Sequence, residues 1–515
     1  MPHRIKRTIA GLALAPALLA QAAVLTPSVA QTFDRRERQQ ETRTLRGSYG
    51  EPVDEADRLD ERRSSDTLQR DGGGGADGTR DRSANGTDGL RGTIETGTDG
   101  PDAVPAAQGP QAPVGETPEP LEPLDVAEDP VLETIEEDPY APIGVRMGSF
   151  LLFPELAAES VYNDNIFLSS IRPEGDWALA LTPALRVQSD WSRHSLEANV
   201  GGEYSFHERF RTEDDESFAA DVTGQIDLRR STNIVASAGY SRAFEDRSSS
   251  DFPANAAERP LVRSNDWSLG GNHTFNRLTL TLRGDVSTDN YGDSVAVDGS
   301  LIDNSGRDYT ERRLTSRAGY EFQPGVQAFV EGSVNERDFV EAVDSGGQLN
   351  GSSGHDIQAG LAFKLSGKLT GEASAGYALQ TPDDPTLKDV DGLIFNAALE
   401  YKPTALTTLR FDAASQVAET TVTGSAGSIN RNVEFSAEHR PRRNIILGAS
   451  IGYQNEKFSG TGETDEDWTT GLTGEYLFTP SVGLIVSYEH VESTSSVPGN
   501  DYSTNEVRMG MRFRR

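Results

Sequence analysis

The sequence predicts an all-β chain, namely a transmembrane antiparallel up-and-down β-barrel of about 18 strands (16–20) preceded by a disordered N-terminal region. Three observations support this fold class. From Phe150 onward apolar residues alternate with small or polar ones, as in strands whose successive side chains point to opposite faces. Short turns alternate with long polar loops. Hydrophobic content is 35% and mean hydropathy is −0.53, which suits strands that turn only alternate residues to lipid.

The clearest alternation lies in a hairpin over residues 433–453. Val433, Phe435 and Ala437 alternate with Glu, Ser and Glu, and the pattern resumes at Ile445 after a polar turn. One face is too polar for the core of a sandwich, and the other is too continuously apolar to meet water. A sheet that is apolar outside and polar inside suits a membrane barrel, because closure leaves no unpaired backbone edge in lipid.

Residues 1–30 read as a secretory signal peptide. Three basic residues precede an apolar run over residues 9–20, and cleavage is predicted between Ala30 and Gln31, with residues 20–22 as a second choice. The apolar run is shorter than the ~20 residues of a spanning helix, which argues against an uncleaved anchor.

Residues 31–145 are predicted to be a disordered acidic periplasmic tail or linker. This stretch contains four consecutive glycines and a Pro/Glu/Asp-rich run, and Lys and Arg are absent from residues 92–145. A segment with low apolar content and high charge buries too little apolar surface to offset the conformational entropy lost on ordering. The alternative is that part of the tail plugs or lines the pore, or docks a partner.

Residues 146–515 are predicted to be the outer-membrane β-barrel. Short turns are predicted near Trp191, Arg230, Asn276, Gln323, Ser366, Pro403, Pro441 and Pro480. Longer loops are predicted at residues 166–176, 211–216, 247–262, 290–308, 341–355, 381–391, 419–429, 459–467 and 493–501. Eight turns and nine loops join eighteen strands, and an even number places both ends of the barrel in the periplasm.

Aromatic residues support this placement. Five of them lie beside short turns, where a periplasmic girdle is expected: Trp191, Phe275, Phe322, Tyr401 and Phe478. The last strand, residues 506–513, resembles the C-terminal signal of the outer-membrane assembly machinery. It departs from that signal because two arginines follow its terminal aromatic residue.

The polar face carries charges of both signs. The predicted lumen-facing, channel-lining residues are Glu197, Glu203, Arg283, Asp285, Arg317, Glu321, Glu331, Arg337, Glu372, Arg410, Asp412, Glu434, Glu438, Glu489 and Arg508. Two interpretations stay open, namely cross-strand ion pairs and a selectivity ladder. Of the net charge of −33, about −21 belongs to the barrel, and a field of that sign favours cations.

Other classes of function are disfavoured. The net charge of −33 repels nucleic acid, so none is expected as a partner. Cysteine is absent and the seven histidines are scattered, so we expect no disulfide framework, no metal site and no cofactor. Acidic loop clusters that bridge lipopolysaccharide through Ca²⁺ are a weak alternative. No nucleophile–base motif is present, and the chain is not expected to be an enzyme.

The start of the barrel resembles the outer-membrane porins of the "beta-barrel porin 2" type. The resemblance covers roughly residues 145–515 and rests on residues 148–155 (GSFLLFPE), 162–165 (YNDN), 181–184 (LTPA), 191–194 (WSRH) and 203–204 (EY). It implies a Gram-negative, commonly proteobacterial, outer-membrane barrel. Members are often encoded among exopolysaccharide synthesis and export genes, which implies a polysaccharide exit channel as a refinement. No residue roles carry over.

The sequence therefore predicts a porin-like passive channel in the cell outer membrane, with a secreted exopolysaccharide as one candidate cargo. The alternative is a non-conducting structural or adhesion barrel that displays acidic extracellular loops. The expected partners are outer-membrane lipid and lipopolysaccharide, the outer-membrane assembly machinery and polysaccharide export components.

Overall fold

The computed structural model describes residues 138–515, apart from residues 254, 344–346, 366, 421 and 423. The predicted signal peptide, its cleavage site at Ala30 and Gln31, and the predicted tail as far as residue 137 lie outside the described residues. Within the described part of the chain, no helix is long and apolar enough to cross a membrane.

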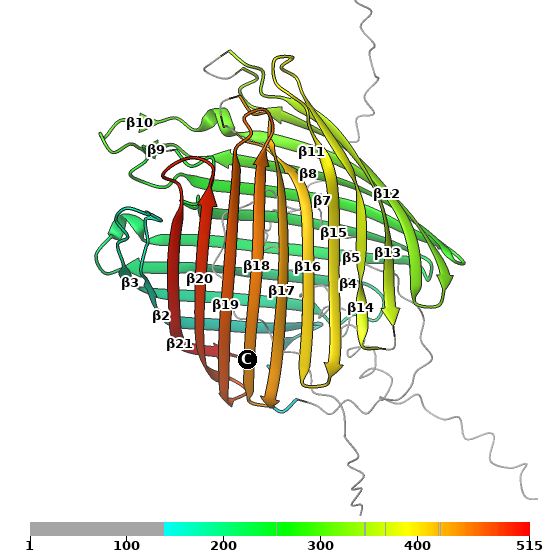
Figure 1. Ribbon diagram of the computed structural model, residues 1–515. Coiled ribbons are helices and arrows are strands. Elements are labelled where there is room, and N and C mark those ends of the chain that lie inside the picture. Colours follow the sequence, from blue (N-terminus) through cyan, green and yellow to red (C-terminus); the bar gives the residue numbers. More distant parts are fainter. Residues whose placement is uncertain (1–137, 254, 344–346, 366, 421, 423) are drawn as a thin grey trace, which may run out of the picture.

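Eighteen strands form one closed antiparallel barrel, and each strand pairs with its neighbours in sequence (Figure 1). The first strand, β2, pairs with the last, β21, from Glu155 opposite Arg514 to Asn163 opposite Glu506, and this pairing closes the sheet. The strands are β2 (Phe150–Asn163), β3 (Asp176–Ser189), β4 (Ser195–His207), β5 (Asp215–Arg229), β6 (Thr232–Phe244), β7 (Leu261–Phe275), β8 (Leu278–Tyr291), β11 (Tyr309–Gln323), β12 (Val326–Phe339), β13 (Ser352–Leu365), β14 (Leu369–Pro382), β15 (Val390–Thr404), β16 (Thr407–Ala418), β17 (Ser428–Arg442), β18 (Ile445–Phe458), β19 (Thr464–Thr479), β20 (Val482–Ser495) and β21 (Tyr502–Arg514).

Short and long connections alternate around the barrel as the sequence predicted, and the predicted count of eighteen strands is confirmed. We call the end with the eight short turns the turn end and the end with the nine loops the loop end. At the turn between β11 and β12, Gly325 has a φ of +75°, a left-handed conformation that favours glycine. Both ends of the barrel sheet, Phe150 of β2 and Arg514 of β21, lie at the turn end.

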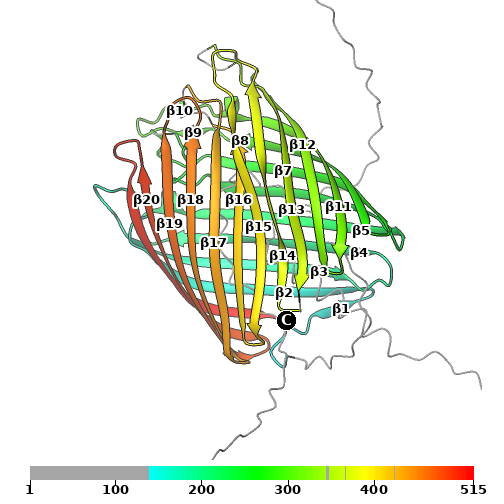
Figure 2. The ribbon, with the colours of Figure 1, turned by 45° about the vertical axis from the view of Figure 1, so that its right-hand side comes forward.

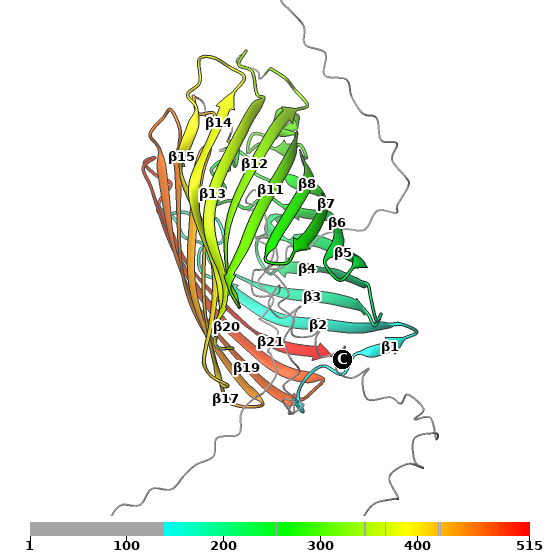
Figure 3. The ribbon, with the colours of Figure 1, turned by 90° about the vertical axis from the view of Figure 1, so that its right-hand side faces the viewer.

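The strands are strongly tilted. In Figure 1, β16 to β21 run upright along the front wall, while β3 to β8 cross behind them at a steep angle, as expected when strands on opposite walls tilt about the barrel axis. Figures 2 and 3 show the C-terminus close to β1 (Val145–Met147), a short strand that pairs with the beginning of β2. A two-stranded ribbon, β9 (Ser294–Val295) and β10 (Leu301–Ile302), lies in the loop between β8 and β11.

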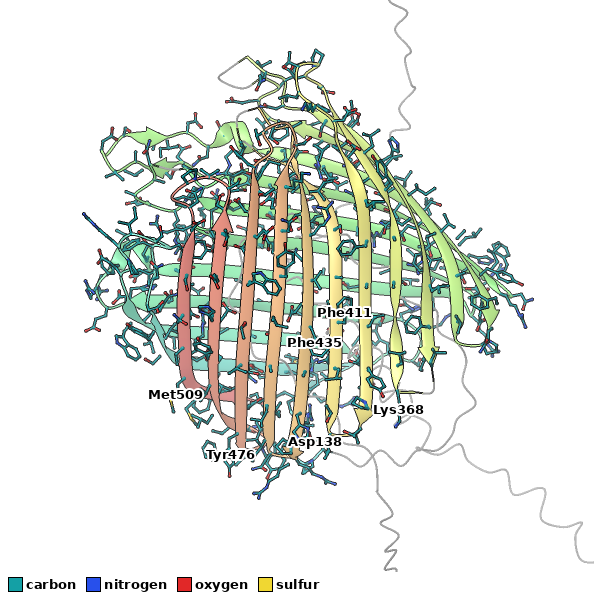
Figure 4. All side chains as sticks on the ribbon, in the orientation of Figure 1. Asp138, Lys368, Phe411, Phe435, Tyr476 and Met509 are labelled. Atoms are coloured by element: carbon teal, nitrogen blue, oxygen red, sulfur yellow. The ribbon has the colours of Figure 1, made fainter. Side chains whose placement is uncertain are left out.

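The outer face of the barrel is apolar. Figure 4 shows Phe411 and Phe435 on neighbouring strands of the front wall, where they are paired in register and exposed. The five aromatic residues predicted beside the short turns are 42–56% exposed, so they form an outward-facing girdle at the turn end. A second set of exposed aromatic residues lies nearer the loop end, and comprises Trp177, Trp267, Tyr377 and Trp468.

Candidate functional site

The inner face of the barrel carries the charged residues. All fifteen residues predicted to face the lumen lie on strands, and several of them stand next to an exposed apolar or aromatic side chain. On β8, for example, Arg283 and Asp285 lie between the exposed Leu282 and Val286. On β17, Glu434 lies beside the exposed Phe435. On these two strands the charged side chains lie on the face opposite the exposed apolar ones, and the role of the fifteen residues in lining a channel stays a prediction.

Arginines on the inner face reach carboxylates on strands that are not their neighbours. Arg317 on β11 donates to both carboxylate oxygens of Glu372 on β14, at 2.8 and 2.6 Å, although β12 and β13 lie between. A second carboxylate, that of Glu331 on β12, lies 3.7 Å from the same guanidinium. Bidentate pairing of an arginine with a carboxylate fixes the orientation of both groups. This cluster therefore stiffens the inner wall from β11 to β14.

The ring of Phe329 packs against the arginine of that cluster. The Arg317 guanidinium lies 3.5 Å from the ring centroid, and Phe329 is only 4% exposed. On β13, a Cβ atom at Gly360 would lie 2.4 Å from the edge of the Phe329 ring. A residue with a side chain at this position would therefore displace the ring and the arginine above it.

Two further arginines make similar long-range contacts. Arg508 on β21 donates to Glu203 on β4 at 3.1 Å and to Glu506 of its own strand at 2.6 Å. Arg337 on β12 pairs with Glu311 on β11 at 2.6 Å, with Glu419 in the loop after β16, and with the Val417 carbonyl at 2.9 Å. Glu311, Glu419 and Val417 were not among the predicted site residues. Glu311 lies opposite Arg337 on the neighbouring strand, whereas Glu419 and Val417 are 82 and 80 residues away in the sequence.

A different part of the wall carries three carboxylates for which no ion pair is described. We call it the acidic strip, and it consists of Asp412 of β16, Glu434 of β17 and Glu489 of β20. Asp412 and Glu434 lie directly opposite each other in the β16–β17 ladder. Among the described residues neither has an ion-pair partner, and the nearby Arg410 pairs with Glu400 at 3.1 Å. Like charges directly opposite in a sheet are destabilising, so this arrangement is not explained by stability.

A loop crosses the barrel at the loop end. Residues 245–260 join β6 to β7, and we call this segment the strap. The Thr420 hydroxyl, in the loop between β16 and β17, donates to Asp251 of the strap at 2.9 Å. Eight of the eighteen strands, β7 to β16 in sheet order, separate the two loops, so they start from nearly opposite sides of the mouth. The strap therefore extends across this mouth.

The base of the strap is held by ion pairs that are largely buried. Glu245 pairs with Arg307 of the β8–β11 loop at 2.6 Å, and Arg247 pairs with Glu213 of the β4–β5 loop at 2.7 Å. Arg259 pairs with Asp215 at the start of β5 at 3.3 Å. The strap thus has several charged anchors at its base and a single described hydrogen bond to the β16–β17 loop.

The described residues contain no group of three or more His, Cys, Asp or Glu side chains that could hold a metal ion. The acidic loop cluster around residues 214–216 is instead engaged with arginines, since Asp215 pairs with Arg259 and Glu216 pairs with Arg242. The carboxylates of this loop cluster are therefore engaged in ion pairs.

Comparisons with known proteins give a family. The profile of the family described as "Putative beta-barrel porin 2" matches residues 138–515. Similar solved structures include the outer membrane protein OpdK from Pseudomonas aeruginosa (10% identity, TM-score 0.36, covering 71% of this chain and 99% of OpdK). They also include OccK2 (OpdF) from the same organism (10%, 0.39, 70% and 98%) and the siderophore receptor PirA from Acinetobacter baumannii (7%, 0.35, 70% and 80%). No curated protein gave a significant match.

The family match covers the whole of the barrel described above, from the first described residue to the C-terminus. The closed eighteen-stranded sheet, its apolar outer face and its charged inner face agree with that match. The chain belongs to the beta-barrel porin 2 family and is a porin-like β-barrel of the outer membrane.

Proposed function

We propose that the barrel is a passive channel for hydrophilic solutes and that its inner wall favours cations. The acidic strip carries the proposal. Asp412 and Glu434 face each other across adjacent strands, and no described arginine or lysine forms an ion pair with either of them. Barrels of 16–18 strands enclose an aqueous interior, and carboxylates that face it attract cations and repel small anions.

The proposed orientation places the turn end in the periplasm and the loop end outside the cell. Outer-membrane barrels have short periplasmic turns and longer extracellular loops. Residues 138–147 precede β2 and lie at the turn end, so this orientation puts the N-terminal region in the periplasm. The remaining proposed associations are with lipid and lipopolysaccharide around the apolar outer face and with the assembly machinery that inserts the barrel.

A secreted exopolysaccharide is the more specific cargo that we propose, with export components as partners on the periplasmic side. The support for this cargo is the family resemblance, since members are often encoded with polysaccharide export genes. Deletion of the gene in its own host tests the refinement separately. Loss of polysaccharide from the medium, with the polymer retained in the periplasm, would support it. Normal secretion of the polysaccharide would show that the channel does not export it, and small hydrophilic solutes would remain the proposed cargo.

The second candidate function is a non-conducting barrel that displays its loops. One observation favours it, because the strap extends across the mouth at the loop end and contacts Thr420 on the far side. A barrel closed there would present an acidic surface without passing solute. Absence of conductance from folded protein would favour this display function.

Conductance in planar bilayers tests the proposal. The full chain should give open channels, and its reversal potential in a KCl gradient should show cation preference. Replacing Asp412, Glu434 and Glu489 with their amides should move the permeability ratio toward unity. The matched control replaces three exposed carboxylates of the outer face, Glu336, Glu466 and Glu492, and should leave the ratio unchanged. An unchanged ratio in the first variant would remove the acidic strip from the selectivity mechanism.

A further inference from the structure

A second group of carboxylates lies on the inner wall near the loop end, where β17 to β21 stand side by side (Figure 1). Asp467 precedes the exposed Trp468 of β19 and so points to the lumen, as does Asp465 two residues before it. Glu456 of β18 lies opposite Asp465 in the ladder and shares its face. Asp246 of the strap lies close enough to Asp467 for their charges to repel each other. We call Asp246, Glu456, Asp465 and Asp467 the loop-end carboxylates, and they extend the acidic strip to the loop end.

The loop-end carboxylates have no cationic partner. In the part of the chain that the structure describes, no Lys, Arg or His forms an ion pair with any of the four, and Arg247 and Arg259 of the strap pair instead with carboxylates near the start of β5. Neutral groups donate to them, as where the Ser495 hydroxyl donates to Asp465 at 2.6 Å. Oδ1 of Asp467 is buried and accepts no hydrogen bond from a described residue. Like charges held close together are destabilising, so this group is not explained by the stability of the barrel.

Asn430 of β17 is an independent indication of a ligand at the same place. It lies opposite Glu456 in the β17–β18 ladder, and it lies on the face of β17 opposite to that of the exposed Phe435, so its side chain points to the lumen beside Glu456. Asn430 is only 2% exposed, and its Oδ1 accepts no hydrogen bond from a described residue. A buried amide oxygen without a donor costs free energy. Asn430 therefore adds an unsatisfied acceptor to the row formed by Glu456 and Asp465.

The acceptors of this row do not converge on one point. The described residues contain no group of three or more acidic, His or Cys side chains that could hold a metal ion. The row from Asn430 to Asp465 spans two strand spacings, about 9–10 Å, and Asp465 and Asp467 are about 7 Å apart along β19. The complementary ligand therefore carries several positive charges spaced along a chain, each with N–H donors. A linear polyamine has both properties.

The strap covers this part of the wall. The side chain of Ser248 reaches the Tyr502 hydroxyl of β21, and Asp251 lies close enough to Glu456 for their charges to repel each other. The hydrogen bond from Thr420 to Asp251 holds the strap at the same level of the barrel. The loop-end carboxylates therefore lie between the strap and the wall, where a solute that enters from the loop end meets them before the acidic strip.

We propose that the loop-end carboxylates and Asn430 bind a linear polyamine, a small organic cation with two or more protonated amino groups. Its ammonium groups donate to the carboxylates of Glu456, Asp465 and Asp467 and to the amide oxygen of Asn430. Charge-assisted hydrogen bonds of this kind are the strong ones, and each ammonium supplies only donors where the site supplies only acceptors. The role of this site as the first binding step of transport rests on the proposed channel, whereas the binding itself does not.

Isothermal titration calorimetry of the folded full chain with spermidine tests the binding without reference to conductance. Saturable binding is expected at about 0.15 M salt, where long-range attraction to the net negative charge is largely screened. Mg²⁺ should bind at least about tenfold more weakly, because the carboxylates do not converge on one ion. The double change Glu456→Gln and Asp467→Asn should weaken spermidine binding at least about tenfold, since it removes charge-assisted contacts.

The matched control is the double change Glu466→Gln and Glu492→Gln, which removes the same number of charges from exposed positions of β19 and β20. This control should leave the affinity for spermidine unchanged. Asn430→Ala removes the unsatisfied oxygen and keeps every charge, and it should weaken binding at least about threefold. Heat-modifiable migration on gels verifies that each variant is folded.

Three outcomes would overturn the proposal. The first is the absence of saturable spermidine binding to the folded parent. The second is equal weakening by the site variant and by the control, which would assign the binding to the net charge of the barrel. The third is binding of Mg²⁺ as tight as that of spermidine, which would make the group a metal site.

Single-channel recording of the same variants separates this proposal from the proposed function. Spermidine should block the parent channel transiently, and the blocks should be shorter in the Glu456→Gln, Asp467→Asn variant than in the control. Open channels in a protein that binds no spermidine would refute the site and leave the channel intact. Saturable spermidine binding with no conductance in any variant would retain the site and refute the channel.

Discussion

Arg317 and Glu372 form a two-pronged ion pair across the inner wall although two strands lie between them. Both carboxylate oxygens accept from the guanidinium, at 2.8 and 2.6 Å, and the two side chains are 6% and 10% exposed. Two side chains can meet over two intervening strands only if the inner surface of the wall is concave between β11 and β14. The ion pair therefore stabilises the curvature of this section of the barrel.

Replacing Arg317 with Met should lower the free energy of unfolding by about 3–5 kcal/mol, because Glu372 would be left buried without its cation. Replacing Arg317 and Glu372 together with Met should recover most of that loss, since an apolar pair of similar volume removes both desolvation penalties. Urea unfolding of the barrel in lipid vesicles, arranged as a double-mutant cycle, measures both effects.

The control for this cycle is Glu331→Gln. Its carboxylate lies 3.7 Å from Arg317 and makes no direct hydrogen bond to it, so its loss should cost less than the loss of Arg317. A double variant no more stable than Arg317→Met alone would show that the pair has no coupling and that the arginine acts through its contact with Phe329.

Strand positions and strand faces follow from the sequence because both depend on local alternation. Along β8 the residues Leu278, Leu280 and Leu282 alternate with Thr279 and Thr281, and this pattern alone decides which face meets lipid. The turns are equally local, since each is a short polar interruption between two alternating segments. These features explain why the eighteen strands were predictable.

The partners of those charged residues are not local. Arg508 meets Glu203 across 305 residues of sequence, and Arg337 meets Glu419 in a loop to which alternation does not apply. Such contacts depend on the curvature of the closed sheet and on the path of each loop. The strap was predicted only as a long polar loop, because nothing in its composition indicates that it reaches Thr420.

The exposed apolar residues of β8 give a second prediction. Leu282 lies at the centre of its outward apolar run, with Leu278 at one end and Val286 at the other, and it is 56% exposed. Leu282→Arg should destabilise the barrel by about 2–4 kcal/mol, while Thr288→Arg, nearer the loop end on the same face, should cost about 0–1 kcal/mol. The measurement is the urea midpoint of refolded protein. Equal costs at the two depths would show that the apolar band is not centred on Leu282.

The strap gives a third prediction. Cysteines at Asp251 and Thr420 in this cysteine-free chain can be joined by a short bis-methanethiosulfonate linker. If movement of the strap opens the mouth, cross-linking should abolish the larger conductance states, and reduction should restore them. Each single cysteine, treated with the same reagent, is the control for modification alone. Identical conductance before and after cross-linking would show that the strap is a fixed element of the wall.

A loop carboxylate gives a prediction of pH dependence. Asp384, between β14 and β15, accepts hydrogen bonds from the Thr386 hydroxyl at 2.6 Å, the Thr386 amide at 2.8 Å and the Leu349 amide at 3.1 Å. These bonds, with that of the Thr386 hydroxyl first, hold the pKa of Asp384 below its usual value of 3.8. Because the folded pKa is lowered, the stabilisation is complete above pH 3.8 and is lost as pH falls through the folded value.

Acidification below the folded pKa of Asp384 should therefore release Leu349 from the loop of residues 383–389. A spin label at Ala342→Cys should show a mobile component that grows as the pH falls below 3.8 and disappears when the pH is restored. Asp384→Asn removes the ionisable group and should make the mobility of the label independent of pH in this range. If the Asn variant titrates like the parent, another acidic group holds these loops together, and the hydrogen bonds of Asp384 do not control their contact.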